Sequence, residues 1–94
     1  MGVQFPPMSR DLVLTDYIEL ALAEATYDKL EDDSFVGRVP SCPGVIAFAS
    51  TLFRCEHELR STLEDWILVG LQMGHPLPVV GGIDLSRKPA SIAV

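Results

Sequence analysis

Residues 51–74, with the sequence TLFRCEHELRSTLEDWILVGLQMG, decide the fold because they predict one long amphipathic helix. Thr51, or Ser50 before it, offers a side-chain oxygen that can cap the first turn. Gly74 fits the left-handed position that ends many helices, and Pro76 cannot extend the helix beyond it. The apolar residues that share one broad face are Leu52, Leu59, Leu63, Trp66, Ile67 and Met73.

The same helix carries apolar residues outside that face. At about 100° per residue, Leu68 falls about 160° from the centre of the face, among charged residues, and Val69 lies at its margin. A helix that is apolar on every side needs packing on every side, and one small sheet covers only one. Gly70 costs the helix about 1 kcal/mol against Ala, so we expect a close approach of the helix to the sheet there.

A first helix is expected to begin at Asp16. Asp16 and Glu19 have the spacing of a capping box, in which the Asp carboxylate accepts from a first-turn N–H and the Glu reaches back. Leu20 lies nearly opposite the apolar face of this helix, so we expect it, with Leu68 and Val69, at an interface between subunits. The residues of that apolar face are Ile18, Ala21, Leu22 and Ala25.

Two strands are predicted at residues 26–30 and 35–39, on either side of the turn at 31–34. Asp and Ser favour turns because their side chains bond the nearby backbone, and Asp tolerates left-handed geometry. Residues 45–49 predict a third short strand, which is apolar on both faces. Residues 77–83 offer a final strand that ends in two glycines. The predicted class is therefore α+β, a small antiparallel sheet backed by helices in the order α-β-β-β-α-β.

Length and composition favour one domain in a reduced, cytoplasmic setting. The chain has 94 residues and a formal charge of −6, and its basic residues form no run. Direct nucleic-acid binding is disfavoured, while a basic protein partner would be attracted. We expect a flexible arm at residues 1–11, the folded domain at 12–85 and a tail at 86–94, without a signal peptide or a membrane span.

Neither a metal site nor catalysis is expected. Cys55 and His57 are two residues apart on a predicted helix and point to opposite sides, and zinc motifs place their ligands at other spacings than those of Cys42, Cys55, His57 and His75. The sequence has no phosphate-binding loop and no activated nucleophile. We therefore expect no cofactor and no enzyme activity, and we interpret the paired carboxylates as solvated.

Short stretches along the chain have an order and spacing that are distinctive when taken together. They are Asp16-Tyr17-Ile18, Ala25-Thr26-Tyr27, Phe35-Val36-Gly37-Arg38-Val39-Pro40, Pro43-Gly44-Val45, Thr51-Leu52, Glu64-Asp65-Trp66-Ile67-Leu68, Leu77-Pro78-Val79 and Gly82-Ile83-Asp84. In this pattern the chain resembles the HicB-like antitoxins, most closely the short cyanobacterial-type group of that superfamily.

The resemblance implies a protein-binding role in a type II toxin–antitoxin system. HicB proteins bind and mask HicA, a small basic toxin that cleaves mRNA, and many carry a C-terminal DNA-binding unit. This chain stops about ten residues after Asp84, which is too short for such a unit, so we expect no operator binding. We expect a homodimer or larger assembly with a HicA-like toxin as partner. The alternative is a stand-alone homo-oligomeric structural or small-molecule-binding domain without a toxin.

Four charged residues are candidate contacts with that partner. Glu31, Asp32 and Asp33 could meet a basic toxin surface, although a hydrated turn is the favoured explanation. Arg38 could reach a carboxylate or phosphate, or it could simply discourage aggregation of an exposed strand. The residues expected to have structural roles are Gly37, Pro43, Gly44, Trp66 and Gly74.

Overall fold

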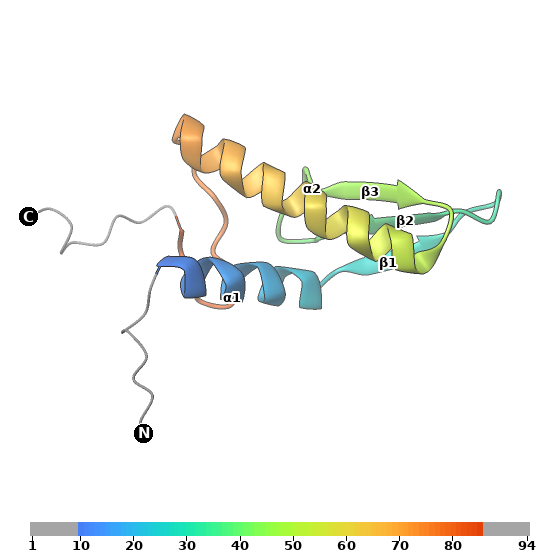
Figure 1. The fold of residues 1–94 in the computed structure, drawn as a ribbon, viewed down its shortest axis with the longest axis horizontal. Helices are drawn as coiled ribbons and strands as arrows, with labels where there is room; N and C mark the ends of the chain where they lie inside the picture. The colour runs from blue at the N-terminus through green and yellow to red at the C-terminus, as the bar shows by residue number, and fades with distance from the viewer. Residues whose placement is uncertain (1–9, 86–94) are drawn as a thin grey trace, which may run out of the picture.

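Three short antiparallel strands in sequence order form the sheet. The computed structural model describes residues 10–85, and its elements are α1 (Arg10–Ala23), β1 (Thr26–Lys29), β2 (Phe35–Arg38), β3 (Ile46–Ala49) and α2 (Leu52–Met73). Strand β2 lies between β1 and β3, and α2 crosses one face of the sheet (Figure 1). The α+β class is confirmed. Residues 1–9 and 86–94, most of the expected arm and the whole tail, lie outside the described residues.

The hairpin between β1 and β2 has the turn that its sequence predicts. Asp33 takes a left-handed conformation with φ of 70°, which Asp adopts more readily than most residues. The carboxylate of Asp32 accepts hydrogen bonds from the backbone N–H of Ser34 at 3.0 Å and from its hydroxyl at 2.5 Å. The turn therefore sets a register in which Tyr27 lies opposite Gly37.

Helix α2 begins and ends as predicted. The Thr51 hydroxyl accepts from the N–H of Arg54 at 3.1 Å, and Gly74 takes the left-handed cap with φ of 71°. The N–H of His75 then donates to the carbonyl of Gly70 at 2.9 Å, which closes the last turn. The residues of α2 that are buried against the rest of the chain are Cys55, Leu59, Leu63, Ile67 and Gly70.

Gly70 is tightly packed, but not against the sheet as expected. A β carbon at this position would lie 2.7 Å from Cδ2 of Leu77, so the close neighbour is the segment that follows α2. That segment turns back toward α1 in Figure 1, and it buries Leu77 and Val80 in the core. Helix α2 therefore packs on the sheet with one part and on this returning segment with another.

The final strand expected at residues 77–83 is reduced to a single bridge. Val80 and Ile83 exchange two antiparallel hydrogen bonds of 3.1 and 2.8 Å, and no longer ladder is formed among the described residues. Pro78 has no N–H to donate to a ladder, and Gly81 and Gly82, with φ of 55° and 81°, reverse the chain at once. The segment is thus a tight turn that fills the core.

The expected start of the first helix is wrong. Helix α1 begins at Arg10, six residues before Asp16 and inside the expected arm, so Asp16 cannot act as its cap. The physical reason is that Leu14 packs against the core one turn before Tyr17 and Ile18, which are buried. Burial of this earlier turn outweighs the local capping signal, which contributes about 1 kcal/mol.

Tyr17 ties α1 to the returning segment. Its ring is fully buried, and its hydroxyl donates a 2.6 Å hydrogen bond to the carbonyl of Pro78.

We predict that Tyr17→Phe lowers the free energy of unfolding by about 1–2 kcal/mol, because the Pro78 carbonyl loses its partner. Tyr27→Phe is the matched control, since Tyr27 is half-buried and its hydroxyl has no partner among the described residues; it should change stability by less than about 0.5 kcal/mol. Urea unfolding followed by circular dichroism measures both, and equal effects would contradict the assigned role.

Because of Tyr17, we also predict that the folded chain loses stability at alkaline pH. Burial, assisted by Cys42, raises the pKa of Tyr17 well above its ordinary value of 10.0. Above about pH 10 the unfolded chain loses a proton that the folded chain keeps, so stability falls by up to about 1.4 kcal/mol per pH unit. Urea midpoints measured between about pH 9 and pH 11 should fall more steeply for the wild type than for Tyr17→Phe. Parallel curves for the two proteins would show that another group causes the loss.

Candidate protein-binding surfaces

One exposed stripe of α2 combines acidic and apolar side chains. We call it the α2 outer face and define it by Glu58, Ser61, Asp65, Leu68 and Gln72, all of which are exposed. Their spacing of three and four residues places them on one side of the helix. This face has the composition of a surface that could bind a basic partner.

The acidic groups of the α2 outer face are not neutralised within the chain. Glu58 and Asp65 form no ion pair among the described residues, whereas nearby Glu64 pairs with Arg60 at 3.3 Å. Arg60 also reaches Glu19 of α1 at 3.1 Å, so its charge is shared between two carboxylates. The α2 outer face therefore keeps a net negative charge, which Arg54, one turn before Glu58, offsets only in part.

The three residues predicted at a subunit interface are all partly exposed in this single chain. Leu68 is 54% exposed and Val69 is 48% exposed, both on the C-terminal half of α2. Leu20 is 41% exposed, and its side chain packs against Gly81, so part of the contact it needs comes from its own chain. Leu68 and Leu20 lie on different helices, and their burial between subunits stays a prediction.

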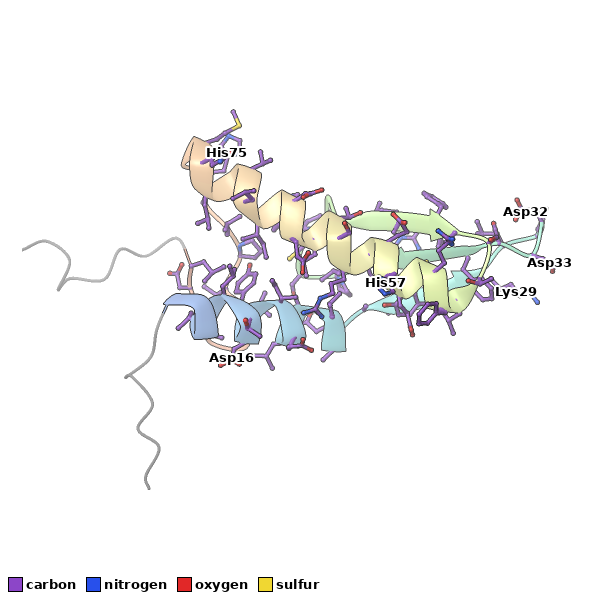
Figure 2. The ribbon with its side chains drawn as sticks, in the orientation of Figure 1. Asp16, Lys29, Asp32, Asp33, His57 and His75 are labelled. Atoms are coloured by element: carbon purple, nitrogen blue, oxygen red, sulfur yellow. The ribbon has the colours of Figure 1, made fainter. Side chains whose placement is uncertain are left out.

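The acidic turn at residues 31–34 is partly satisfied by its own neighbours. Figure 2 shows Lys29, Asp32 and Asp33 together at the tip of the hairpin, where the Lys29 Nζ lies 3.6 Å from a carboxylate oxygen of Asp33. The hydrogen bonds from Ser34 lower the pKa of the Asp32 carboxyl. Glu31 is exposed and makes no ion pair among the described residues. Asp32 and Asp33 thus have local partners, which Glu58 and Asp65 of the α2 outer face lack among the described residues.

Arg38 lies on the sheet face that α2 does not cover. Its guanidinium is 3.6 Å from the carboxylate of Asp28 on β1, and both side chains are largely exposed. An exposed pair of this kind contributes little to stability, so Arg38 is held loosely. Its charge is offset by that of Asp28.

Two large apolar residues on this uncovered face were not among the predicted contacts. Ile46 is 42% exposed and Phe48 is 63% exposed. They lie opposite Arg38 and Val36 respectively, so all four share one face of the sheet. The signal in the sequence was a third strand that is apolar on both faces.

The predicted structural residues mostly act by being small. A β carbon on Gly37 would lie 2.8 Å from the Tyr27 ring, and one on Gly44 would lie 3.1 Å from Nε1 of Trp66. Trp66 is half-buried against the core, and Pro43 is exposed beside Gly44. These positions shape the backbone around β2 and the loop before β3, and Gly74 caps α2.

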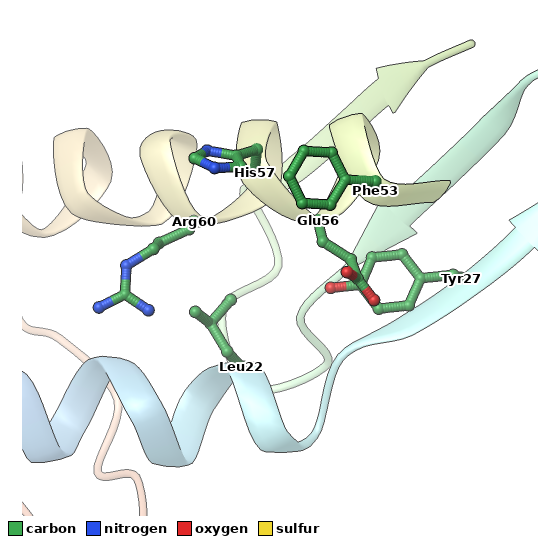
Figure 3. A pocket seen from close by; sticks show the side chains of 6 residues that line it. All are labelled: Leu22, Tyr27, Phe53, Glu56, His57 and Arg60. Carbon is green, nitrogen blue, oxygen red and sulfur yellow. The ribbon is translucent and has the colours of Figure 1, made fainter. Parts of the chain in front are cut away.

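A shallow groove lies between the end of α1, β1 and the first half of α2. It measures about 280 Å³, and Figure 3 shows the six side chains around it. Phe53 packs edge-on against His57 with ring centroids 5.4 Å apart, while Arg60 is engaged in its ion pairs. The residues that line the groove are Leu22, Tyr27, Phe53, Glu56, His57 and Arg60.

The groups considered for metal binding or nucleophilic chemistry are dispersed. His57, on α2, and His75, just after its end, lie far apart in Figure 2, and Cys42 and Cys55 are buried free thiols. Burial raises the pKa of both thiols, which disfavours the reactive thiolate. Residues 10–85 include no group of three side chains able to hold a metal ion and no helix suited to crossing a bilayer.

Comparison with known families identifies the domain. A sequence model of the UPF0150-like family matches residues 16–78, a range that includes all three strands and α2. The chain belongs to the UPF0150-like family. This family is of the HicB-like, antitoxin type, so the resemblance inferred from the sequence is confirmed at that level.

The UPF0150-like fold is also found in a solved structure. The crystal structure of TTHA0281 from Thermus thermophilus is similar to this chain, with 37% sequence identity and a TM-score of 0.75. The similarity covers 82% of this chain and 95% of that one. No curated protein matches the sequence. The likeness therefore extends over almost the whole of TTHA0281.

The ends of the UPF0150-like match meet in space. Tyr17 follows the first residue of the range 16–78, and Pro78 is its last residue. The Tyr17 hydroxyl donates a hydrogen bond to the Pro78 carbonyl. Although 61 residues separate them, they close the domain on itself. The two ends of the matched range are thus held together.

Proposed function

We propose that this UPF0150-like chain is an antitoxin-type binding module that masks a small, basic, RNA-cleaving toxin by direct contact. A protein that binds RNA presents Lys and Arg to the phosphates. An acidic protein surface that pairs with the same side chains excludes the RNA. The module therefore acts by occupancy and needs no catalytic group of its own.

The observation that carries this proposal is the α2 outer face. Glu58 and Asp65 lie seven residues apart on one side of the helix without a counter-ion among the described residues, and Leu68 stands 54% exposed beside them. A basic partner would neutralise both carboxylates and cover the leucine in one contact. Charges at such an interface mainly steer the encounter, and the buried apolar residue at its centre adds affinity.

Basic groups that would repel such a partner are mostly neutralised within the chain. Arg38 pairs with Asp28, Arg60 pairs with Glu19 and Glu64, and Lys29 pairs with Asp33. With a formal charge of −6, the whole chain attracts a basic protein over the Debye length of about 8–10 Å. The α2 outer face is favoured over the turn at residues 31–34 because Asp32 and Asp33 already have partners.

The test is capture of a HicA-like toxin encoded beside the gene for this chain. The two proteins are co-expressed, purified together and measured by isothermal titration. We predict a stable complex that weakens as salt rises, and a double variant Glu58→Lys, Asp65→Lys that binds at least about tenfold more weakly. Co-expression of the wild-type chain should also restore growth that the toxin alone arrests.

A matched control separates this face from the overall charge. The double variant Asp16→Lys, Glu56→Lys changes the net charge by the same amount at two exposed carboxylates that belong neither to the α2 outer face nor to the other candidate contacts. Equal weakening by both double variants would assign the effect to net charge and reject the α2 outer face. Absence of any complex at low salt would reject the toxin partner and favour the stand-alone alternative.

A further inference from the structure

Strand β3 is an open sheet edge that carries no charge. It lies at the end of the strand order β1-β2-β3, and Figure 1 shows it at the rim of the sheet. Its sequence is Ile-Ala-Phe-Ala, whereas β1, the other edge, carries Asp28 and Lys29. Charged residues on an edge strand hinder pairing with another chain, and an uncharged edge invites it. Only one of the two edges is therefore protected.

The hydrogen-bond pattern shows which backbone groups of β3 point outward. The N–H of Val39 donates to the carbonyl of Val45 at 3.3 Å, and these residues continue the β2–β3 register by one pair. Hydrogen-bonded pairs alternate along an antiparallel ladder, so Ala47 bonds β2 while Ile46 and Phe48 do not. The N–H and C=O groups of Ile46 and Phe48 therefore point away from β2.

The pairing of β1 with β2 agrees with this assignment. The N–H of Leu30 donates to the carbonyl of Ser34 at 2.7 Å, which makes that pair hydrogen-bonded. The alternation then directs Val36 and Arg38 toward β1 and leaves Gly37 for β3. Both ladders of the sheet give the same orientation.

The side chains on this edge complete an apolar patch. Ile46 and Phe48 project from the face that α2 leaves bare, with 42% and 63% of their surfaces exposed. The patch lies within residues 39–53, a run without any Asp, Glu, Lys, Arg or His. Backbone groups and side chains thus offer a hydrogen-bonding edge and an apolar face side by side.

We infer that β3 pairs antiparallel with β3 of a second copy of this chain, forming one continuous six-stranded sheet across a two-fold axis. The register that uses every outward group pairs Ile46 of one copy with Phe48 of the other and places Ala47 on the axis. It sets a β-branched residue opposite an aromatic one, a favourable cross-strand pair. On the α2 side, the residue at the axis is only an alanine.

Charge selects a second copy as the occupant of this edge. Two copies that each carry a formal charge of −6 repel one another, and the repulsion is weaker where the contact itself carries no charge, as in residues 39–53. Contact through the α2 outer face would instead oppose Glu58 and Asp65 of both copies. A basic toxin, by contrast, gains no electrostatic attraction from an uncharged edge. The inference therefore does not depend on the proposed toxin.

The first experiment measures mass and amide exchange on the wild-type chain alone. Light scattering from about 1 to about 100 μM should approach twice the monomer mass of 10.3 kDa. Under the same conditions, hydrogen exchange followed by NMR should show the Ile46 and Phe48 amides slowing as the dimer forms. The Ala47 amide is the internal control, because its bond to β2 protects it at every concentration.

The second experiment removes one outward N–H. Phe48→Pro loses a donor that β2 does not use, at the kind of edge position where proline is tolerated, while Phe48→Ala loses the same ring and keeps the donor. We expect Phe48→Pro to raise the dimer dissociation constant at least about tenfold more than Phe48→Ala. Leu68→Glu tests the other subunit interface, the one predicted from the sequence at Leu20, Leu68 and Val69; if the copies pair through β3, this variant should leave the mass unchanged.

Three results would overturn the inference. A wild-type monomer across the whole concentration range would exclude the dimer. A dimer with rapidly exchanging Ile46 and Phe48 amides would place the contact on another surface, as would dissociation by Leu68→Glu alone. Equal dissociation by Phe48→Pro and Phe48→Ala would show that side chains, and not strand pairing, hold the copies together.

Discussion

A sheet has two faces, and this chain supplies one long helix to cover one of them. Where α2 crosses the sheet, Gly37 lies opposite Ala47, so the helix can approach closely enough for the Cys55 thiol to donate to the Ala47 carbonyl at 3.6 Å. The large side chains of β3, Ile46 and Phe48, are on the bare face. In a domain that works as a single chain, we expect the opposite arrangement, since burial of large apolar side chains is the main source of stability. The exposed Ile46 and Phe48 are the side chains that the inferred β3 pairing would bring together.

The parts of the fold that could be predicted from the sequence are those set by neighbours in the chain. The caps of α2 at Thr51 and Gly74 depend on the side chain and the conformation of one residue each, so local rules suffice. The start of α1 could not be predicted in this way, because burial near Tyr17 outweighs the cap at Asp16. The contact of Gly70 with Leu77 could not be predicted either, since the path of the segment after α2 depends on where the two helices leave space.

The candidate surfaces likewise include one residue whose exposure the sequence predicts and one whose exposure it does not. Helical periodicity alone predicts that Leu68 is exposed, because it places this leucine opposite the apolar face of the helix, among charged residues. The exposure of Phe48 cannot be predicted in this way, because a sequence that is apolar on both faces is equally typical of a strand buried on both faces. Only the sheet topology, which leaves β3 at an edge with one face bare, identifies Phe48 as an exposed residue.

Charge and apolarity are segregated on this small domain, and the separation permits two contacts at once. The α2 outer face has acidic groups without counter-ions among the described residues, while the β3 edge lies in a run with no charge at all. Because β3 contacts α2 through the opposite side of the helix, pairing at the edge leaves the α2 outer face of each copy exposed. A dimer would then present two acidic faces on one rigid sheet. Two linked sites of this kind hold a partner with two binding surfaces far more tightly than one site does, provided the geometry lets both engage together.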